Sequence, residues 1–254
     1  PLENGDQQTA DQWSKILLGI FKRENVYETI SNAFYQGSLV SGMSLLQVIN
    51  DYTNDPVSGD VKVCLRTYNQ IMIDPYFRNM DLSDASFVRT RSYVSHLQAG
   101  ILLPQYYEEI MKLQGNPTGM SKDSYFMYMP EAQGRSQENR LAYDEYYYRS
   151  FREQKLLIDK VTGDTLDVTN KDTLDIDRFV AENPQVKLIK QNIPTVRLAI
   201  AIQDKVFYDG PHPLGIDDYG FIPVMGYYNP TLPYFYSRIQ GLCRSMRDPQ
   251  FLLI

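Results

Sequence analysis

The sequence predicts an α+β protein, with helices in its N-terminal and middle parts and a mainly antiparallel sheet in its second half. Two observations carry this prediction. Apolar residues recur at helical spacing between residues 10 and 38. Residues 141–236, in contrast, hold short runs of β-branched and aromatic residues separated by turns rich in Asp, Gly and Pro. The second half is therefore expected to form a β meander or a small barrel.

Residues 10–114 are expected to form a part in which helices and strands are mixed. After the first helical region, "SLLQVINDY" and "VKVCLRTYNQIMI" have the composition of strands, and the turn "TNDPVSGD" joins them. "SFVRTRSYVS" alternates as a strand. Ser95 then caps a short helix, which Pro104 ends.

The β-rich part is expected to span residues 141–236. "YDEYYYRSFREQKLLID" and "TLDVT" flank a Gly-containing turn, and residues 171–183 form an acidic linker or a short helix. Four separate short strands are predicted to follow: "VKLIKQ", "PTVRLAIAIQ", "KVFYDG" and "GFIPVMGYY".

The C-terminal segment, residues 237–254, predicts the start of a long helix. At about 100° per residue from Arg238 to Met246, the residues Ile239, Leu242 and Met246 share one face. The dipeptide Asp248-Pro249 either begins a new helix or kinks a continuing one. The chain ends on four apolar residues and does not begin with methionine, so we expect it to be an internal fragment of a longer protein.

Two sets of side chains in this segment are candidates for function. The apolar set is a candidate subunit interface: Ile239, Leu242, Met246, Phe251, Leu252 and Leu253. The basic set is a candidate surface toward DNA or a channel: Arg238, Arg244 and Arg247. An ordinary amphipathic helix with a solvated arginine edge is the alternative interpretation of the same pattern.

Composition narrows the classes of function. The chain has 254 residues, of which 43% are hydrophobic and 22% charged, which is typical of a folded globular protein rather than a disordered or membrane-embedded one. Its net charge of −6 argues against a protein that grips nucleic acid with its whole surface, so at most weak, non-specific DNA binding is expected. The two cysteines, Cys64 and Cys243, could pair, but two free, buried thiols in a reducing compartment are the favoured interpretation.

Sequence motifs for catalysis, metals or cofactors are absent. The chain has two histidines, His96 and His212, and no His or Cys pair at zinc-ligand spacing. It has no phosphate-cradling glycine loop and no nucleophile turn of the Gly-x-Ser-x-Gly type. We therefore expect no enzymatic activity, no catalytic residue, no bound metal and no cofactor.

The carboxylates and tyrosines of the chain allow one alternative function. Asp81 with Asp84 fits a turn and cap better than an acid–base pair, and Asp144 with Glu145 fits a solvated strand. In the run "YDEYYY", alternation places Tyr146 and Tyr148 on one face and Tyr147 on the other. Core packing, a partner interface and a ligand platform all stay open for these tyrosines. A carbohydrate-binding or glycoside-processing domain is thus the alternative of a different class.

The order of segments resembles the portal proteins of tailed bacteriophages, and in particular those of short-tailed phages. "FIPVMGYY", then "NPTLPYFYS", then "RIQGLCRSMRDPQFLLI" is similar to a family element in which a Pro-bearing strand and a tyrosine pair precede an arginine-containing helix. The matching helix positions are Gly241, Leu242, Arg244, Asp248 and Gln250. Upstream, "IMIDPYFRNMDLSDASFVRTRSYVS" is similar to the same family, and the likeness touches most of residues 10–254.

This resemblance implies a structural role in the virion. Portals of this kind form rings, typically dodecameric, at the capsid vertex, where double-stranded DNA enters during packaging and leaves at ejection. The implied partners are further copies of the chain, the terminase large subunit, the major capsid protein and a head–tail adaptor, with no membrane. Residues 1–254 would be the peripheral wing region, and residues 237–254 would lead into a channel-lining stem. Another phage connector or tail protein is the alternative within the same class.

Overall fold

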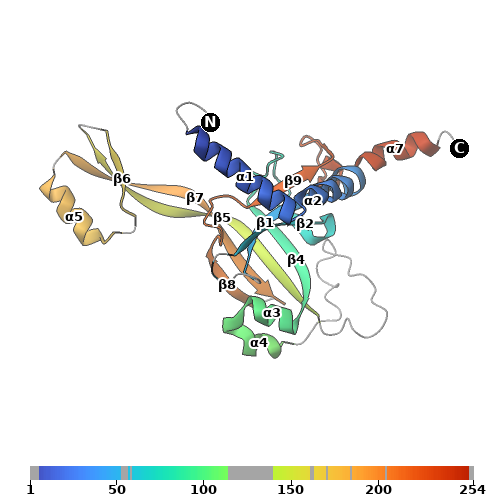
Figure 1. Cartoon of the computed structure of the whole chain (residues 1–254), viewed down its shortest axis with the longest axis horizontal. Helices are drawn as coiled ribbons and strands as arrows, with labels where there is room; N and C mark the ends of the chain where they lie inside the picture. The colour runs from blue at the N-terminus through green and yellow to red at the C-terminus, as the bar shows by residue number, and fades with distance from the viewer. Residues whose placement is uncertain are drawn as a thin grey trace.

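The computed structural model describes residues 6–52, 57, 59–113, 140–160, 163–169, 171–183, 185–203 and 205–251 (Figure 1). The helical elements are α1 (Gln7–Arg23), α2 (Val26–Ala33), the π-helix η1 (Phe34–Ser41), the 3₁₀ turns η2 (Tyr68–Gln70) and η3 (Pro104–Tyr106), α3 (His96–Leu102), α4 (Tyr107–Met111), α5 (Thr173–Glu182), α6 (Phe235–Arg238) and α7 (Leu242–Phe251). The strands are β1 (Met43–Asp51), β2 (Asp60–Arg66), β3 (Ile71–Ile73), β4 (Phe87–Ser95), β5 (Arg140–Asp159), β6 (Thr165–Asp167), β7 (Val186–Ile202), β8 (Lys205–Pro211), β9 (Phe221–Met225), β10 (Tyr227–Tyr228) and β11 (Ile239–Gln240).

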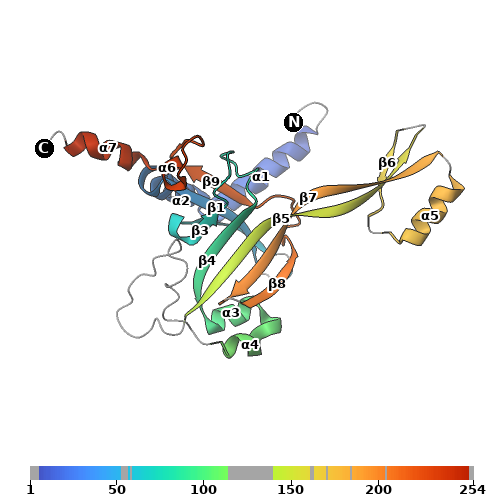
Figure 2. The same ribbon diagram turned by 180° about the vertical axis from the view of Figure 1, so that it is seen from behind.

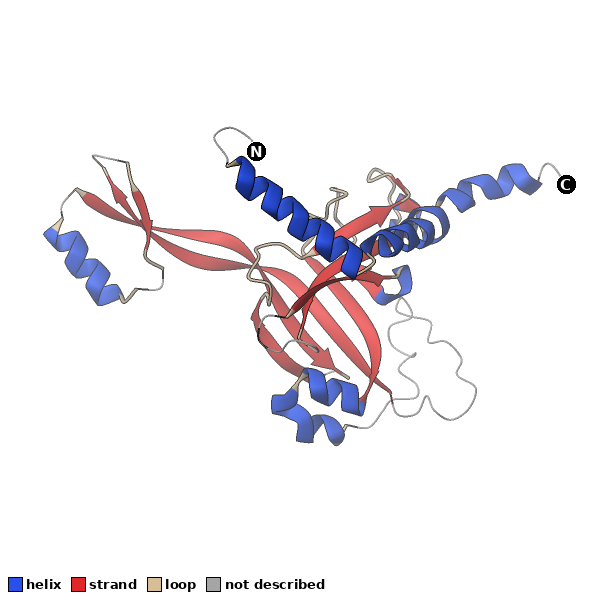
Figure 3. Ribbon diagram, in the orientation of Figure 1, coloured by secondary structure: helices blue, strands red, loops and turns tan. Residues whose placement is uncertain are grey.

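The predicted α+β class and the antiparallel meander are confirmed. A six-stranded sheet has the order β3-β4-β5-β7-β8, with β6 paired to β5, and its strands β4, β5, β7 and β8 neighbour one another in chain order. A second sheet has the order β2-β1-β9, and β10 pairs with β11. The larger sheet is open rather than closed into a barrel, because β3 and β8 lie at its two edges. Figure 3 shows this division into sheets and peripheral helices.

The main core lies between the two sheets. Leu45 of β1 and Phe221 of β9 belong to one buried apolar cluster with Tyr147 of β5 and Leu198 of β7. The sheet of β1 and β9 therefore packs on the face of the meander to which Tyr147 points. A separate cluster, which includes Ile110 of α4 and residues of α3, β5 and β8, covers one end of the meander.

The two longest strands form an arm that leaves the body. β5 and β7 pair without interruption from Tyr143 opposite Ile202 to Asp159 opposite Val186. Figures 1 and 2 show their outer halves extending from the sheet as a two-stranded ribbon that carries β6 and α5 at its tip. A small apolar cluster, which includes Leu157 and Ile176, holds that tip together.

The prediction of two separate strands in residues 186–202 is wrong, because β7 runs through Pro194 as one strand. Pro194 pairs opposite Phe151 of β5, whereas β8 pairs only with residues 197–202 of β7. At Pro194, β7 is therefore an edge strand, with no β8 on its outer side. An edge strand tolerates a residue without a backbone N–H.

The prediction of one helix from Arg238 to Met246 is also wrong. α6 ends at Arg238, β11 follows, and α7 begins only at Leu242. The break lies at Gly241, where an added Cβ would be 2.5 Å from the Val40 carbonyl oxygen of η1. Gly42, which ends η1 with φ +96°, faces the same crossing and lies close to the backbone of Gln240. The close approach of two backbones thus requires glycine and interrupts the helix. The Asp248-Pro249 pair lies inside α7 and does not begin a new helix.

Candidate functional site

The predicted apolar stripe at the C-terminus is divided in the structure. Ile239 is buried in the core between the sheets, whereas Leu242, Met246 and Phe251 are exposed on α7. At 100° per residue, Leu242 and Met246 share a face of α7 and Phe251 lies on the opposite side. Leu252 and Leu253 lie outside the described residues. The exposed members remain candidates for a subunit interface, and Ile239 stabilises the fold beneath them.

The three candidate arginines differ in their surroundings. Arg238 donates from Nε to the Leu232 carbonyl oxygen at 2.6 Å and from Nη1 to the Pro75 carbonyl oxygen at 2.8 Å. It therefore ties the C-terminal segment to the loop that precedes β4. Arg244 and Arg247 are exposed on the side of α7 that carries Phe251. Contact of any of the three with DNA stays a prediction.

A second exposed apolar surface lies on α1. Trp13, with 61% of its surface exposed, and Leu17, with 53%, belong to a 17-residue helix that has no buried residue. The helix is attached mainly at its C-terminal end. There Phe21 packs edge-on against Tyr27 of α2, with 5.6 Å between the ring centroids, and Arg23 Nη2 lies 3.0 Å from Asp60 Oδ1. The N-terminal part of α1 extends away from the body (Figure 1).

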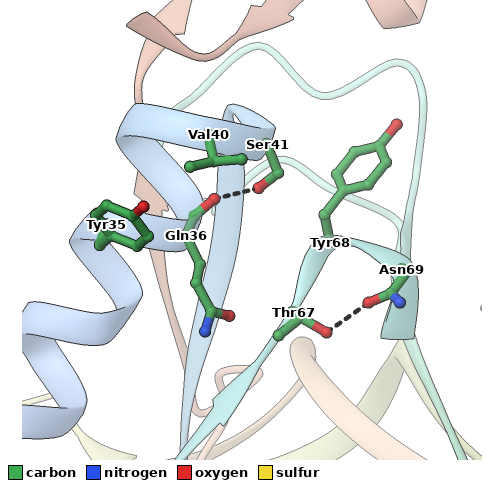
Figure 4. Close-up of a pocket in the computed structure, with 7 residues that line it drawn as sticks. All are labelled: Tyr35, Gln36, Val40, Ser41, Thr67, Tyr68 and Asn69. Atoms are coloured by element: carbon green, nitrogen blue, oxygen red, sulfur yellow. Dashed lines mark hydrogen bonds between the residues drawn. The ribbon is translucent and has the colours of Figure 1, made fainter. Parts of the chain in front are cut away.

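A hollow of about 580 Å³ lies between η1 and η2. Figure 4 shows its lining, in which Tyr35, Val40 and Tyr68 supply exposed apolar surface. Its polar groups bond locally: the Ser41 hydroxyl donates to the Gln36 carbonyl oxygen, and the Thr67 hydroxyl donates to the Asn69 side chain. The remaining residues that line the hollow are Gln36, Ser41, Thr67 and Asn69. None of the seven carries a charge at neutral pH.

The carboxylates weighed for glycoside chemistry do not share a site. Asp144 accepts from Arg91 Nε at 2.6 Å and from Arg89 Nη2 at 2.7 Å. Glu145, the next residue along β5, points to the other face of the sheet, where it accepts a 3.4 Å hydrogen bond from the Tyr147 hydroxyl. Each carboxylate is thus occupied in a separate structural network, on opposite sides of β5.

The tyrosine run divides as alternation predicts. Tyr147 is buried, and burial raises the pKa of its hydroxyl, which accepts a 3.0 Å hydrogen bond from Gln47 Nε2. Tyr146 and Tyr148 stack on the other face, with ring centroids 5.7 Å apart. Core packing is therefore the role of Tyr147.

Exposed apolar side chains on α1 and α7 are the main surface features of the described residues. Among the described residues, no group of three His, Cys, Asp or Glu side chains could hold a metal ion. Both cysteines are free thiols, but the expectation that they are buried is wrong, because Cys64 is half-buried and Cys243 is exposed on α7. In the part of the chain that the structure describes, no helix has the length and apolar character needed to cross a membrane.

Comparison with known protein families matches residues 1–253 to the family described as Phage P22-like portal protein. The chain belongs to the P22-like phage portal protein family. The portal family resemblance drawn from the order of sequence segments is thereby confirmed. No curated protein sequence matches the chain.

For a portal protein, exposed apolar surfaces are the features of interest, since this is a family of structural phage proteins. The apolar residues of α7 were found from the sequence, but the surface of α1 and the hollow were not assigned a function. Apolar residues at positions 13, 16, 17, 20 and 21 were visible as a helical stripe. The sequence could not show that the first three of them stay exposed in the part of the chain that the structure describes. The hollow depends on η1 lying beside η2, which no local pattern indicates.

Proposed function

We propose that this portal protein is the subunit of a homo-oligomeric ring at the capsid vertex, and that the ring forms the channel for DNA packaging and ejection. The observation that carries the proposal is the family match over residues 1–253, together with exposed apolar side chains on α1 and α7. A structural protein that displays such surfaces is suited to repeated contacts with its own copies. The dodecameric number is taken from the family resemblance.

The proposal includes partners and a location. The ring would meet the major capsid protein at its rim, the terminase large subunit during packaging and a head–tail adaptor afterwards. Double-stranded DNA would pass through the channel without being held, which suits a net charge of −6, because phosphate binding requires concentrated basic residues. The protein would thus be found in the host cytoplasm during assembly and at the portal vertex of the virion.

Residues 1–254 would form the wing region of the subunit, and α7 would lead into a channel-lining stem. The proposed interface then consists of Leu242, Met246, Leu252 and Leu253, whereas Phe251 lies on the side of α7 that carries the two arginines. The face with Arg244 and Arg247 would be turned toward the channel. Ile239 and Arg238 would hold the base of this segment on the body through the contacts described above.

The test compares assembly of the natural full-length protein with that of a double variant, Leu252→Asp with Leu253→Asp. Light scattering should give the mass of a ring for the wild type and of smaller species for the variant, with unchanged circular dichroism. Leu166→Asp is the control, since Leu166 is an exposed leucine at the tip of the arm. We expect residues 1–254 alone to be monomeric or weakly associated. A full-length protein that stays monomeric, or a 1–254 chain that is already a stable dodecamer, would contradict the proposal.

A further inference from the structure

We propose that α1 of one subunit docks by the exposed part of its apolar stripe, Trp13, Ile16 and Leu17, on the hollow between η1 and η2 of the neighbouring copy. The stripe is defined here as Trp13, Ile16, Leu17, Ile20 and Phe21. This inference rests on the proposed ring and names the contact that joins one subunit to the next. The occupant of the hollow is thus a second copy of this chain.

One face of α1 is apolar and partly exposed. At 100° per residue the five residues of the stripe fall within an arc of about 140°, and Asp11, Lys15 and Lys22 lie on the opposite side. Ile20 and Phe21 are partly buried beside α2, whereas Trp13, Ile16 and Leu17 are exposed. An isolated helix of this length is marginal in water, because most helix stability comes from packing an apolar face. The N-terminal turns of α1 therefore call for a partner surface.

The hollow matches the stripe in chemistry. Neither surface carries an ionised side chain, so bringing them together desolvates no charge. Tyr35 and Tyr68 on its rim and Trp13 on the stripe are of the residue types that anchor protein interfaces. At 61% exposure, Trp13 alone offers about 90–150 Å² of surface.

The stripe and the hollow lie on different sides of the molecule. A closed ring needs a head-to-tail contact, in which two different surfaces on each copy meet. In Figures 1 and 2, α1 and α7 extend away from the body on different sides. The hollow lies on the α7 side, because η1, which forms one wall, packs against α7. Each copy can therefore present α1 to one neighbour and the hollow to the other.

The decisive experiment uses two adjacent leucines of α1. Leu17 and Leu18 have almost the same exposure, 53% and 52%, but Leu18 is turned by about 100° from Leu17 and lies off the stripe. We expect Leu17→Asp to raise the concentration for half-maximal ring assembly of the full-length protein about tenfold or more, which corresponds to the loss of one buried leucine from each contact. Leu18→Asp should stay within about twofold of the wild type, because Leu18 lies off the stripe and loses no contact with the neighbouring copy. Analytical ultracentrifugation measures assembly, and thermal unfolding of the unassembled chain confirms that both variants fold.

Cross-linking then identifies the occupant. In a background with Cys64→Ser and Cys243→Ser, copies with Trp13→Cys are mixed with copies with Val40→Cys and oxidised. We expect disulfide-linked dimers only in the mixture. Dimers of Trp13→Cys with itself would indicate a two-fold contact between α1 helices and would overturn the proposal.

The remaining outcomes separate this inference from the proposed function. Rings that form equally well in wild type, Leu17→Asp and Leu18→Asp would refute the α1 contact and leave the ring intact. Equal loss of assembly in both variants would show that the stripe has no special role. A wild type that never assembles would remove the proposed function itself. Flotation with phosphatidylglycerol vesicles that is lost in Leu17→Asp, with assembly unchanged, would assign α1 to a membrane surface instead.

Discussion

Phe77 should control both the stability of the body and the position of the C-terminal segment. The side chain is fully buried and its ring stacks on Tyr228 at 5.1 Å, with Phe235 of α6 edge-on at 6.3 Å. The Tyr228 hydroxyl also donates a 2.9 Å hydrogen bond to the Phe77 carbonyl oxygen. The ring thus joins the loop before β4 to the elements that lead into α7.

Phe77→Ala removes the ring and leaves a cavity among aromatic neighbours, which typically costs about 3–5 kcal/mol. In a chain of this size each kcal/mol lowers Tm by about 2–4 °C, so we expect a fall of about 6–20 °C. Differential scanning calorimetry measures this change. Hydrogen exchange should quicken more in residues 227–240 than in the arm.

The control is the neighbouring Tyr76→Ala. Tyr76 is 81% exposed, and the backbone N–H that it donates to Asp74 survives the substitution. Its effect on Tm should be small, because exposed side chains away from special contacts contribute little. If Phe77→Ala lowered Tm no more than Tyr76→Ala does, the assignment of Phe77 as a core anchor would be refuted.

Two further predictions concern buried charge. Asp144→Asn should lower the free energy of unfolding in urea by about 3–5 kcal/mol, because it leaves two arginine side chains around Asp144 without their carboxylate. The control is Asp209→Asn, at the exposed ion pair with Arg197, which should lower it by about 1 kcal/mol or less. Equal losses in the two variants would contradict the structural role of Asp144. Burial acts to raise the pKa of Asp74, but hydrogen bonds from the N–H groups of Tyr76 and Ser86 outweigh it and lower the pKa below its usual value. The stabilisation by Asp74 should therefore be present above about pH 4 and be lost as the pH falls through the lowered pKa. The difference in unfolding free energy between wild type and Asp74→Asn should accordingly decrease on acidification. A difference independent of pH would exclude this mechanism.

Local elements of the fold were predictable because their signals are local. Ser95 begins α3 as expected, and the structure adds a capping box in which Gln98 returns a contact to the Ser95 backbone. The alternation in "YDEYYY" correctly assigned Tyr147 to one face and its neighbours to the other. In both cases the residues that decide the structure lie within a few positions of one another.

The rest depends on contacts between distant segments. Met43 of β1 pairs with Met225 of β9, and no pattern in either strand specifies that partner. The continuity of β7 through Pro194 depends on β8 stopping short of it. The separation of Ile239 from Leu242 depends on the backbone of η1 crossing at Gly241. For the same reason the exposed apolar members of the candidate site were predicted as residues but not as surfaces.

The crossing at Gly42 and Gly241 has a consequence for the curvature of an assembly. It brings the backbone of η1 against the segment that leads into α7, with no room for a side chain between them. The orientation of α7 relative to the N-terminal helices is therefore set by main-chain geometry. In a closed ring, neighbouring subunits are related by a rotation equal to the full circle divided by the number of copies. Any error in that angle recurs at every contact. A stiff joint between the two sides of the subunit would keep that error small, so the crossing would help to determine how many copies close the ring.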